Sequence, residues 1–146
     1  MKQTFKNHTL HLGLQVRQTK KIKRYFDLAK NVAFSSVYGK IRHGAILVKG
    51  GPVINTCYNK DKFCSFGSRF RDPSRGHATI HAELGCILGI PRAVTSGADV
   101  YVCRINKHGE FRNSKPCAMC HEVMKHVGIK RVYYTTSEGT VEMYKL

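Results

Sequence analysis

The sequence lacks any long apolar segment. None of its hydrophobic runs approaches the roughly 18 residues that a membrane-spanning helix needs. The opening stretch, MKQTFKNHTLHLGLQV, also lacks the apolar core of a secretory signal peptide. We therefore expect an intracellular protein, cytoplasmic or nuclear, that is not secreted and has no membrane partner.

Acidic residues are scarce as well. Asp and Glu total nine against 25 Lys and Arg, which gives a formal net charge of +16 and an isoelectric point near 9.9. A surface of this charge attracts polyanions and raises the rate at which it meets them. A generally basic surface without a specific partner is the alternative, and nucleotides and acidic lipids are other anionic candidates. We favour a polyanionic partner.

Tryptophan is absent too, but its absence excludes nothing. A hydrophobic content of 42% excludes a chain that is disordered throughout, and 146 residues suit about one domain. We divide the chain into a basic N-terminal arm, residues 1–19, and a single domain, residues 20–146.

The cysteines do not form the pattern of a disulfide framework. Cys117 and Cys120 make a C-x-x-C motif, while the other four are scattered through apolar stretches: Cys57, Cys64, Cys86 and Cys103. This arrangement predicts reduced thiols and one metal site. Cys57, Cys64 and His77 leave a second, structural zinc site open.

Hydrophobic periodicity predicts an α/β fold. An apolar stripe predicts a first helix from Lys20 to a stop at Gly39, through Ile22, Phe26, Ala29, Ala33 and Val37. Two apolar runs across Gly50-Gly51 predict a hairpin of residues 44–48 and 52–58.

Further helices are predicted near residues 80–88 and 116–127, and further strands at 98–105, 131–136 and 140–146. Residues 59–79 are predicted to be a long loop, and residues 106–115 a polar connection. The order implies a mixed sheet of about five strands flanked by helices, in three layers.

Three residues have the chemistry of zinc ligands. His81 lies in HATIHAELGC, and Cys117 and Cys120 lie in SKPCAMC. Thiolates and imidazole suit zinc better than magnesium or calcium, and three protein ligands leave a fourth position open for catalysis. Each motif stands at the start of a predicted helix, where the helix dipole favours anionic thiolates. We therefore expect one catalytic Zn²⁺.

Glu83 follows His81 by two residues and is predicted to lie on the same first helical turn. A carboxylate beside a zinc-activated water can take up a proton and return it to a leaving amine. The combined pattern H-x-E…P-C-x-x-C is the known signature of zinc nucleobase deaminases.

At these residues the chain resembles the cytidine deaminase-like superfamily, over about residues 20–135. The resemblance implies that family's fold, a zinc held by His81, Cys117 and Cys120, Glu83 as general acid and base, and attack on C4 of cytosine or C6 of adenine. It also implies that Asn59 and Ala82 contact the substrate. A His as first ligand is similar to the tRNA adenosine, AID/APOBEC and deoxycytidylate branches. Homo-oligomers occur in the family, and the sequence itself does not fix the oligomeric state.

Two features depart from that family. RINKHGEFRNSK is longer than the usual link between the third strand and the Pro-Cys motif. The chain also ends soon after the fourth strand, so an antiparallel fifth strand is expected in place of a further helix and strand.

The loop before His81 carries the candidate substrate cations Arg69, Arg71 and Arg75. Phenylalanines are interleaved with them, and these either stack on bases or anchor the loop to the core: Phe63, Phe66 and Phe70. Because a monophosphate needs fewer cations than a polynucleotide, the charge favours conversion of cytosine to uracil in single-stranded DNA or RNA. The alternatives are a deoxycytidylate (dCMP) deaminase acting on a nucleotide monophosphate and an adenosine deaminase acting on tRNA. A catalytically silent nucleic-acid-binding module is disfavoured because Glu83 is present.

Overall fold

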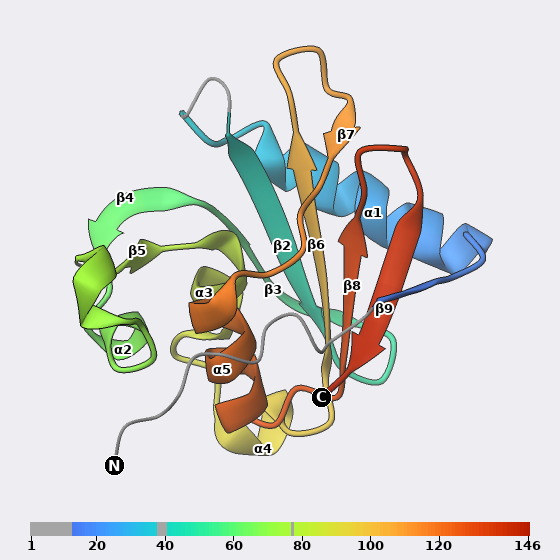
Figure 1. The fold of residues 1–146 in the computed structure, drawn as a ribbon. Coiled ribbons are helices and arrows are strands. Elements are labelled where there is room, and N and C mark those ends of the chain that lie inside the picture. The colour runs from blue at the N-terminus through green and yellow to red at the C-terminus, as the bar shows by residue number, and fades with distance from the viewer. Residues whose placement is uncertain (1–12, 38–40, 77) are drawn as a thin grey trace.

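The computed structural model describes residues 13–37, 41–76 and 78–146. A seven-stranded mixed sheet runs through its centre in the order β1-β9-β8-β6-β2-β3, with β7 paired to β6 (Figure 1). The strands of this sheet are β1 (Leu14–Gln15), β2 (Arg42–Val48), β3 (Val53–Tyr58), β6 (Asp99–Ile105), β7 (Phe111–Arg112), β8 (Arg131–Thr135) and β9 (Val141–Lys145). The α/β class with a mixed sheet flanked by helices is confirmed. Two of the seven strands, β1 and β7, are only two residues long.

Helix α1 (Lys20–Ala33) covers one face of the sheet, and α3 (Ala82–Ile87) and α5 (Ala118–His126) cover the other (Figure 1). Each face therefore has its own buried cluster. Tyr25, Phe26 and Ala29 of α1 pack with Ile46 and Tyr101 on one side. On the other side the helices pack against alternate residues of the same strands: Ala45, Leu47, Val100 and Val102.

The first helix is shorter than predicted. It begins at Lys20, where the Thr19 side chain caps it by accepting a hydrogen bond from the Ile22 N–H. It ends at Ala33, because the Ser35 and Ser36 N–H groups bond to carbonyls three residues back and tighten the last turn. The prediction that Val37 continues the stripe is wrong, since Val37 lies beyond the helix and is 89% exposed. The predicted stop at Gly39 lies outside the described residues.

The predicted strands are confirmed. β2 and β3 pair antiparallel across Gly50-Gly51, both of which have positive φ. β6 and β8 run parallel with α5 between them in the chain, and β9 returns antiparallel to β8, as expected for the short C-terminal segment.

Two predicted irregular segments contain regular structure. Residues 59–79 hold β4 (Lys60–Phe63) and β5 (Thr79–Ile80), which form a separate two-stranded sheet. Between them lie α2 (Ser65–Ser68) and the 3₁₀ helix η2 (Pro73–Arg75). The predicted polar connection contains β7, and α4 (Arg92–Thr95) follows α3. No helix in the described part of the chain is long and apolar enough to cross a membrane.

Gly44 sets the distance between α1 and the sheet. A methyl group at this position would collide with the Ala29 carbonyl oxygen and would lie 2.7 Å from the Ala33 nitrogen. We expect Gly44→Ala to push the helix outward and to lower the free energy of unfolding by about 1–3 kcal/mol. Chemical denaturation measures this change, and an unaltered midpoint would contradict the close approach of helix and strand.

Candidate active site

The two helices on the second face bring three potential metal ligands together. His81 is the residue before α3, Cys117 is the residue before α5, and Cys120 lies in the first turn of α5. The His81 Nδ1 atom lies 3.4 Å from the Cys120 Sγ and 3.6 Å from the Cys117 Sγ. All three ligand atoms lie within 4.8 Å of one another, and they are the only such group found among the described residues.

These separations fit tetrahedral zinc. With a Zn–N bond of about 2.0 Å and a Zn–S bond of about 2.3 Å, the tetrahedral angle places nitrogen and sulfur about 3.5 Å apart. The donor set of one imidazole and two thiols also suits zinc. The predicted zinc ligands are therefore assembled in one place.

The two sulfur atoms are strongly coupled. The hydrogen bond with Cys120 lowers the pKa of Cys117 to about 3, while Cys117 and burial together raise the pKa of Cys120 well above its usual value. The two thiol pKa values are therefore shifted in opposite directions. A metal cation bound by both sulfurs lets both act as thiolates.

Glu83 lies in the first turn of α3 and its side chain is only 5% exposed. Burial raises the pKa of its carboxyl group, and the neighbouring His81 opposes that shift. A carboxyl group with a raised pKa exchanges protons more readily near neutral pH than an exposed one. Glu83 lines the same cavity as His81 and Cys117.

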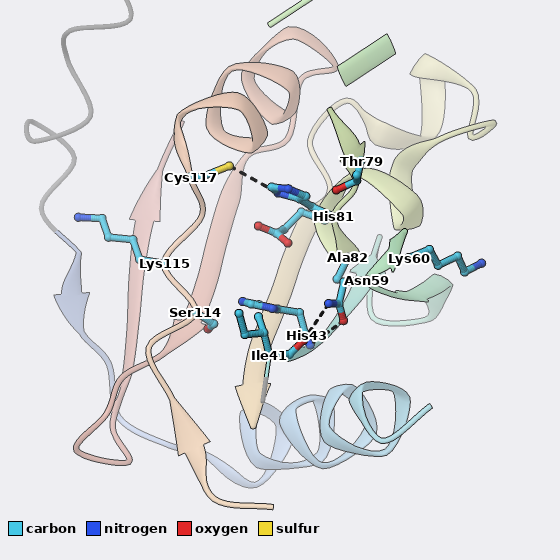
Figure 2. A pocket seen from close by; sticks show the side chains of 11 residues that line it. Ile41, His43, Asn59, Lys60, Thr79, His81, Ala82, Ser114, Lys115 and Cys117 are labelled. Atoms are coloured by element: carbon cyan, nitrogen blue, oxygen red, sulfur yellow. Dashed lines mark hydrogen bonds between the residues drawn. The ribbon is translucent and has the colours of Figure 1, made fainter. Parts of the chain in front are cut away.

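That cavity, of about 380 Å³, is the metal pocket (Figure 2). It is lined by Ile41, His43, Asn59, Lys60, Thr79, His81, Ala82, Glu83, Ser114, Lys115 and Cys117. Both expected base contacts, Asn59 and Ala82, are thus present. The Asn59 amide joins the end of β3 to the start of β2: its Oδ1 accepts from the His43 N–H and its Nδ2 donates to the Ile41 carbonyl, each at 2.9 Å. Lys60 and Lys115 extend away from the pocket on two sides (Figure 2).

A second cavity, of about 180 Å³, meets the metal centre from the loop side. It shares His81 and Cys117 with the metal pocket, and Arg71 and Arg75 line it. The Arg71 Nε is buried without a hydrogen-bond partner among the described residues. Arg69 lies elsewhere, with its guanidinium 5.8 Å from the centre of the Phe66 ring.

The phenylalanines of this segment differ in how far they are buried. Phe66 and Phe70 pack against the buried cluster and lie edge to face, with ring centres 5.4 Å apart. They therefore anchor the segment to the core. Phe63 is 62% exposed. Of the residues considered for a second zinc, His77 lies outside the described residues, and Cys64 caps α2 by accepting from the Gly67 N–H.

His43 is a pocket residue that the sequence did not single out. Burial, with the nearby Arg104 charge, lowers the pKa of His43 to about 4, so its imidazole is neutral at physiological pH. A lone histidine at the start of a strand gives no ligand spacing. The available signal was alternation, because His43 shares a strand face with Ala45 and Leu47, which pack under α3.

Comparison with known proteins agrees with this geometry. Residues 19–136 match the family described as the cytidine and deoxycytidylate deaminase zinc-binding region. No curated protein matches the sequence significantly.

Among solved structures, the apo dCMP deaminase of cyanophage S-TIM5 is 21% identical. It superposes with a TM-score of 0.58 over 81% of this chain and 85% of that one. The same enzyme in complex with dCMP and dUMP is 20% identical, with a TM-score of 0.55 over 84% and 90% of the two chains. One form of Acinetobacter baumannii RibD is 18% identical, with a TM-score of 0.52 over 80% of this chain and 28% of RibD. At these identities the likeness to solved structures establishes the fold. Because the family match covers most of the sequence and includes the assembled His and Cys ligands, the chain belongs to the zinc-dependent cytidine and deoxycytidylate deaminase family.

Proposed function

We propose that this protein hydrolyses the cytosine of a nucleotide to uracil and releases ammonia. The observation that carries the proposal is the buried Glu83 carboxyl group in the same pocket as a three-residue zinc site. Water is the second substrate, and its oxygen replaces the exocyclic amine at C4 of the base.

Glu83 moves the proton in this reaction. Zinc, when bound by His81, Cys117 and Cys120, supplies a Lewis acid that makes water more acidic. The Glu83 carboxylate takes the proton from water as the oxygen attacks C4, and it then delivers a proton to the departing amine. Its burial supports this role, because the raised pKa lets the carboxyl group hold the proton between the two steps.

Two pocket residues hold the base. Ala82 is the first residue of α3, where backbone N–H groups have no partner within the helix, so its N–H can donate to the cytosine carbonyl. Asn59 is fixed by its two backbone contacts, and each end of its amide keeps capacity for one more hydrogen bond. We assign it to the polar edge of the nucleotide.

The charge distribution favours single-stranded nucleic acid as the molecule that carries the cytosine. Arg71 and Arg75 in the second cavity are suited to one phosphate group. Two further cations, Lys60 and Lys115, stand at the rim of the metal pocket, and the net charge is +16. This is more positive charge than one monophosphate requires.

Free dCMP is the second candidate. The observation in its favour is the similar fold of the cyanophage S-TIM5 enzyme, whose structure contains dCMP and dUMP. In this case Arg71 and Arg75 would hold the single phosphate. The two candidates differ in salt dependence, since polynucleotide binding weakens steeply with added salt and mononucleotide binding does so much less.

Replacement of Glu83 tests the reaction itself. Zinc-loaded protein is incubated with a single-stranded oligonucleotide containing all four bases and with free dCMP in one tube. We expect uracil in the oligonucleotide by mass spectrometry, and Glu83→Ala should lower turnover by about 10²- to 10⁴-fold with zinc still bound. Conversion of dCMP alone would establish the second candidate. Substantial turnover by Glu83→Ala would refute the proposed proton transfer.

Replacement of Cys117 tests the metal site. Cys117→Ser should lose zinc and lower the melting temperature by about 4 °C or more, because the ion stabilises only the folded chain. Cys103→Ala is the matched control, since Cys103 is a buried thiol in the cluster on the α1 side of the sheet. Zinc content and thermal melts of both variants provide the measurement. A fully metallated Cys117→Ser protein would overturn the ligand assignment.

The three loop arginines test where the substrate phosphate binds. Two of them line the second cavity, and the third provides a control. Charge reversal of Arg71 and Arg75 to Glu should raise the Kd for a single-stranded oligonucleotide by roughly tenfold or more at low salt. Arg69→Glu should change it much less, because the Arg69 side chain lies on Phe66 outside both cavities. A change in log Kd for Arg69→Glu that is half as large as that for the double reversal would mean that only net charge matters, because the single reversal changes the net charge by half as much.

A further inference from the structure

The segment that departs from the family pattern forms an ordered hairpin. β6 continues to Ile105, the chain turns at residues 106–110, and β7 pairs back so that Arg112 lies opposite Arg104. The Asn106 side chain fixes the turn by accepting from the N–H groups of His108 and Glu110, at 3.0 and 2.9 Å. The proposed reaction assigns no role to this hairpin.

The hairpin extends a row of side chains that starts in the metal pocket. His43 on β2 pairs with Arg104 on β6, and Arg104 pairs with Arg112 on β7, all in antiparallel register. Directly opposite residues on antiparallel strands project from the same face of the sheet. That face is the one with the metal centre, because Ala45 and Leu47, at alternate positions after His43, lie in the cluster under α3 and α5.

Within the described part of the chain, the two arginines lack a strong partner of opposite charge. Like charges directly opposite each other across a strand pair destabilise a sheet. The Arg104 Nε is buried without a hydrogen bond among the described residues. Among the described residues, Arg112 has one acidic partner, Glu110, with 4.0 Å between the Arg112 Nη2 and the Glu110 Oε1. The two side chains are 40% and 61% exposed, so that pair is weak. A bound anion would relieve the repulsion and supply acceptors.

The charge of this pair also acts on the pocket. After burial, the Arg104 charge is the main cause that lowers the pKa of His43, and the two residues lie directly opposite each other on β6 and β2.

We propose that Arg104 and Arg112 form a phosphate-binding subsite at the His43 end of the metal pocket. This proposal rests on the proposed function, because it requires that the substrate is a nucleotide. Arg71 and Arg75 line the second cavity, which meets the metal centre at His81 and Cys117. Two separate arginine pairs around one reacting base match a polynucleotide, in which phosphates lie on both sides of each nucleoside. The phosphate of the target nucleotide itself is the other source of the same chemistry.

Binding measurements on zinc-loaded protein carrying Glu83→Ala test the subsite without turnover. The variants are Arg104→Gln with Arg112→Gln, and Arg112→Gln alone, which alters a side chain that is 40% exposed and keeps the test valid if the double variant unfolds. The control is Arg92→Gln on α4, which lies at the end of the sheet away from β7 (Figure 1). The ligands are a short single-stranded thymidine oligonucleotide with one central cytosine, and free dCMP.

We expect the double variant to raise the oligonucleotide Kd roughly tenfold at low salt. The slope of log Kd against log salt should fall by about 0.7 for each phosphate that the arginines no longer neutralise. An unchanged Kd for dCMP would identify the phosphate as one of the flanking polynucleotide. Equal weakening of both ligands would identify it as the target nucleotide's own.

Binding of both ligands equal to that of the Arg92→Gln control would overturn the subsite. Failure of the wild-type protein to deaminate either ligand would contradict the proposed function and leave this binding result unaffected.

Discussion

His81 and Cys117 each stand immediately before a helix, and the packing of α3 and α5 on one sheet face holds the His81 Nδ1 3.6 Å from the Cys117 Sγ. The rest of the site depends on this convergence. α3 lies close to β3 because Gly85 has no side chain to collide with Cys57. The same helix then carries Glu83 and Ala82 into the pocket, one residue apart. A shift of either helix would separate the ligands and remove the carboxyl group from the water it is proposed to deprotonate.

The site was more predictable from the sequence than the fold around it. His81, Glu83, Cys117 and Cys120 stand in two short motifs at helix starts, and the two motifs together form a known signature, although the packing of the two helices is what brings them together. β4, β5 and β7 were missed because each is a short strand, defined by a partner distant in the sequence and not by an apolar pattern of its own. Helix α1 was predicted too long, because the apolar stripe in the sequence continues to Val37. The helix ends at Ala33, where backbone hydrogen bonds tighten its last turn. His43 was missed because its place in the pocket comes from strand pairing alone.

The electrostatics of the pocket separate two kinds of charge. At the centre, burial raises the pKa of Glu83, and the hydrogen bond between the two thiols, with burial, raises the pKa of Cys120. A bound metal cation would offset the cost of burying thiolates there. Around it, cations come from four segments: Lys60 on β4, Arg71 and Arg75 before α3, Arg104 and Arg112 on the hairpin, and Lys115 before α5. In the proposed function, chemistry and substrate capture therefore rest on different residues, and we expect changes in the outer cations to alter which nucleotide binds without altering the reaction.

X-ray absorption at the zinc edge of the purified protein tests the central claim most directly. We expect one zinc per chain, with two sulfur scatterers at about 2.3 Å, one imidazole nitrogen at about 2.0 Å and one further light atom. Four protein ligands, or a shell containing three or more sulfur atoms, would contradict an open catalytic site, because such a site is closed and structural.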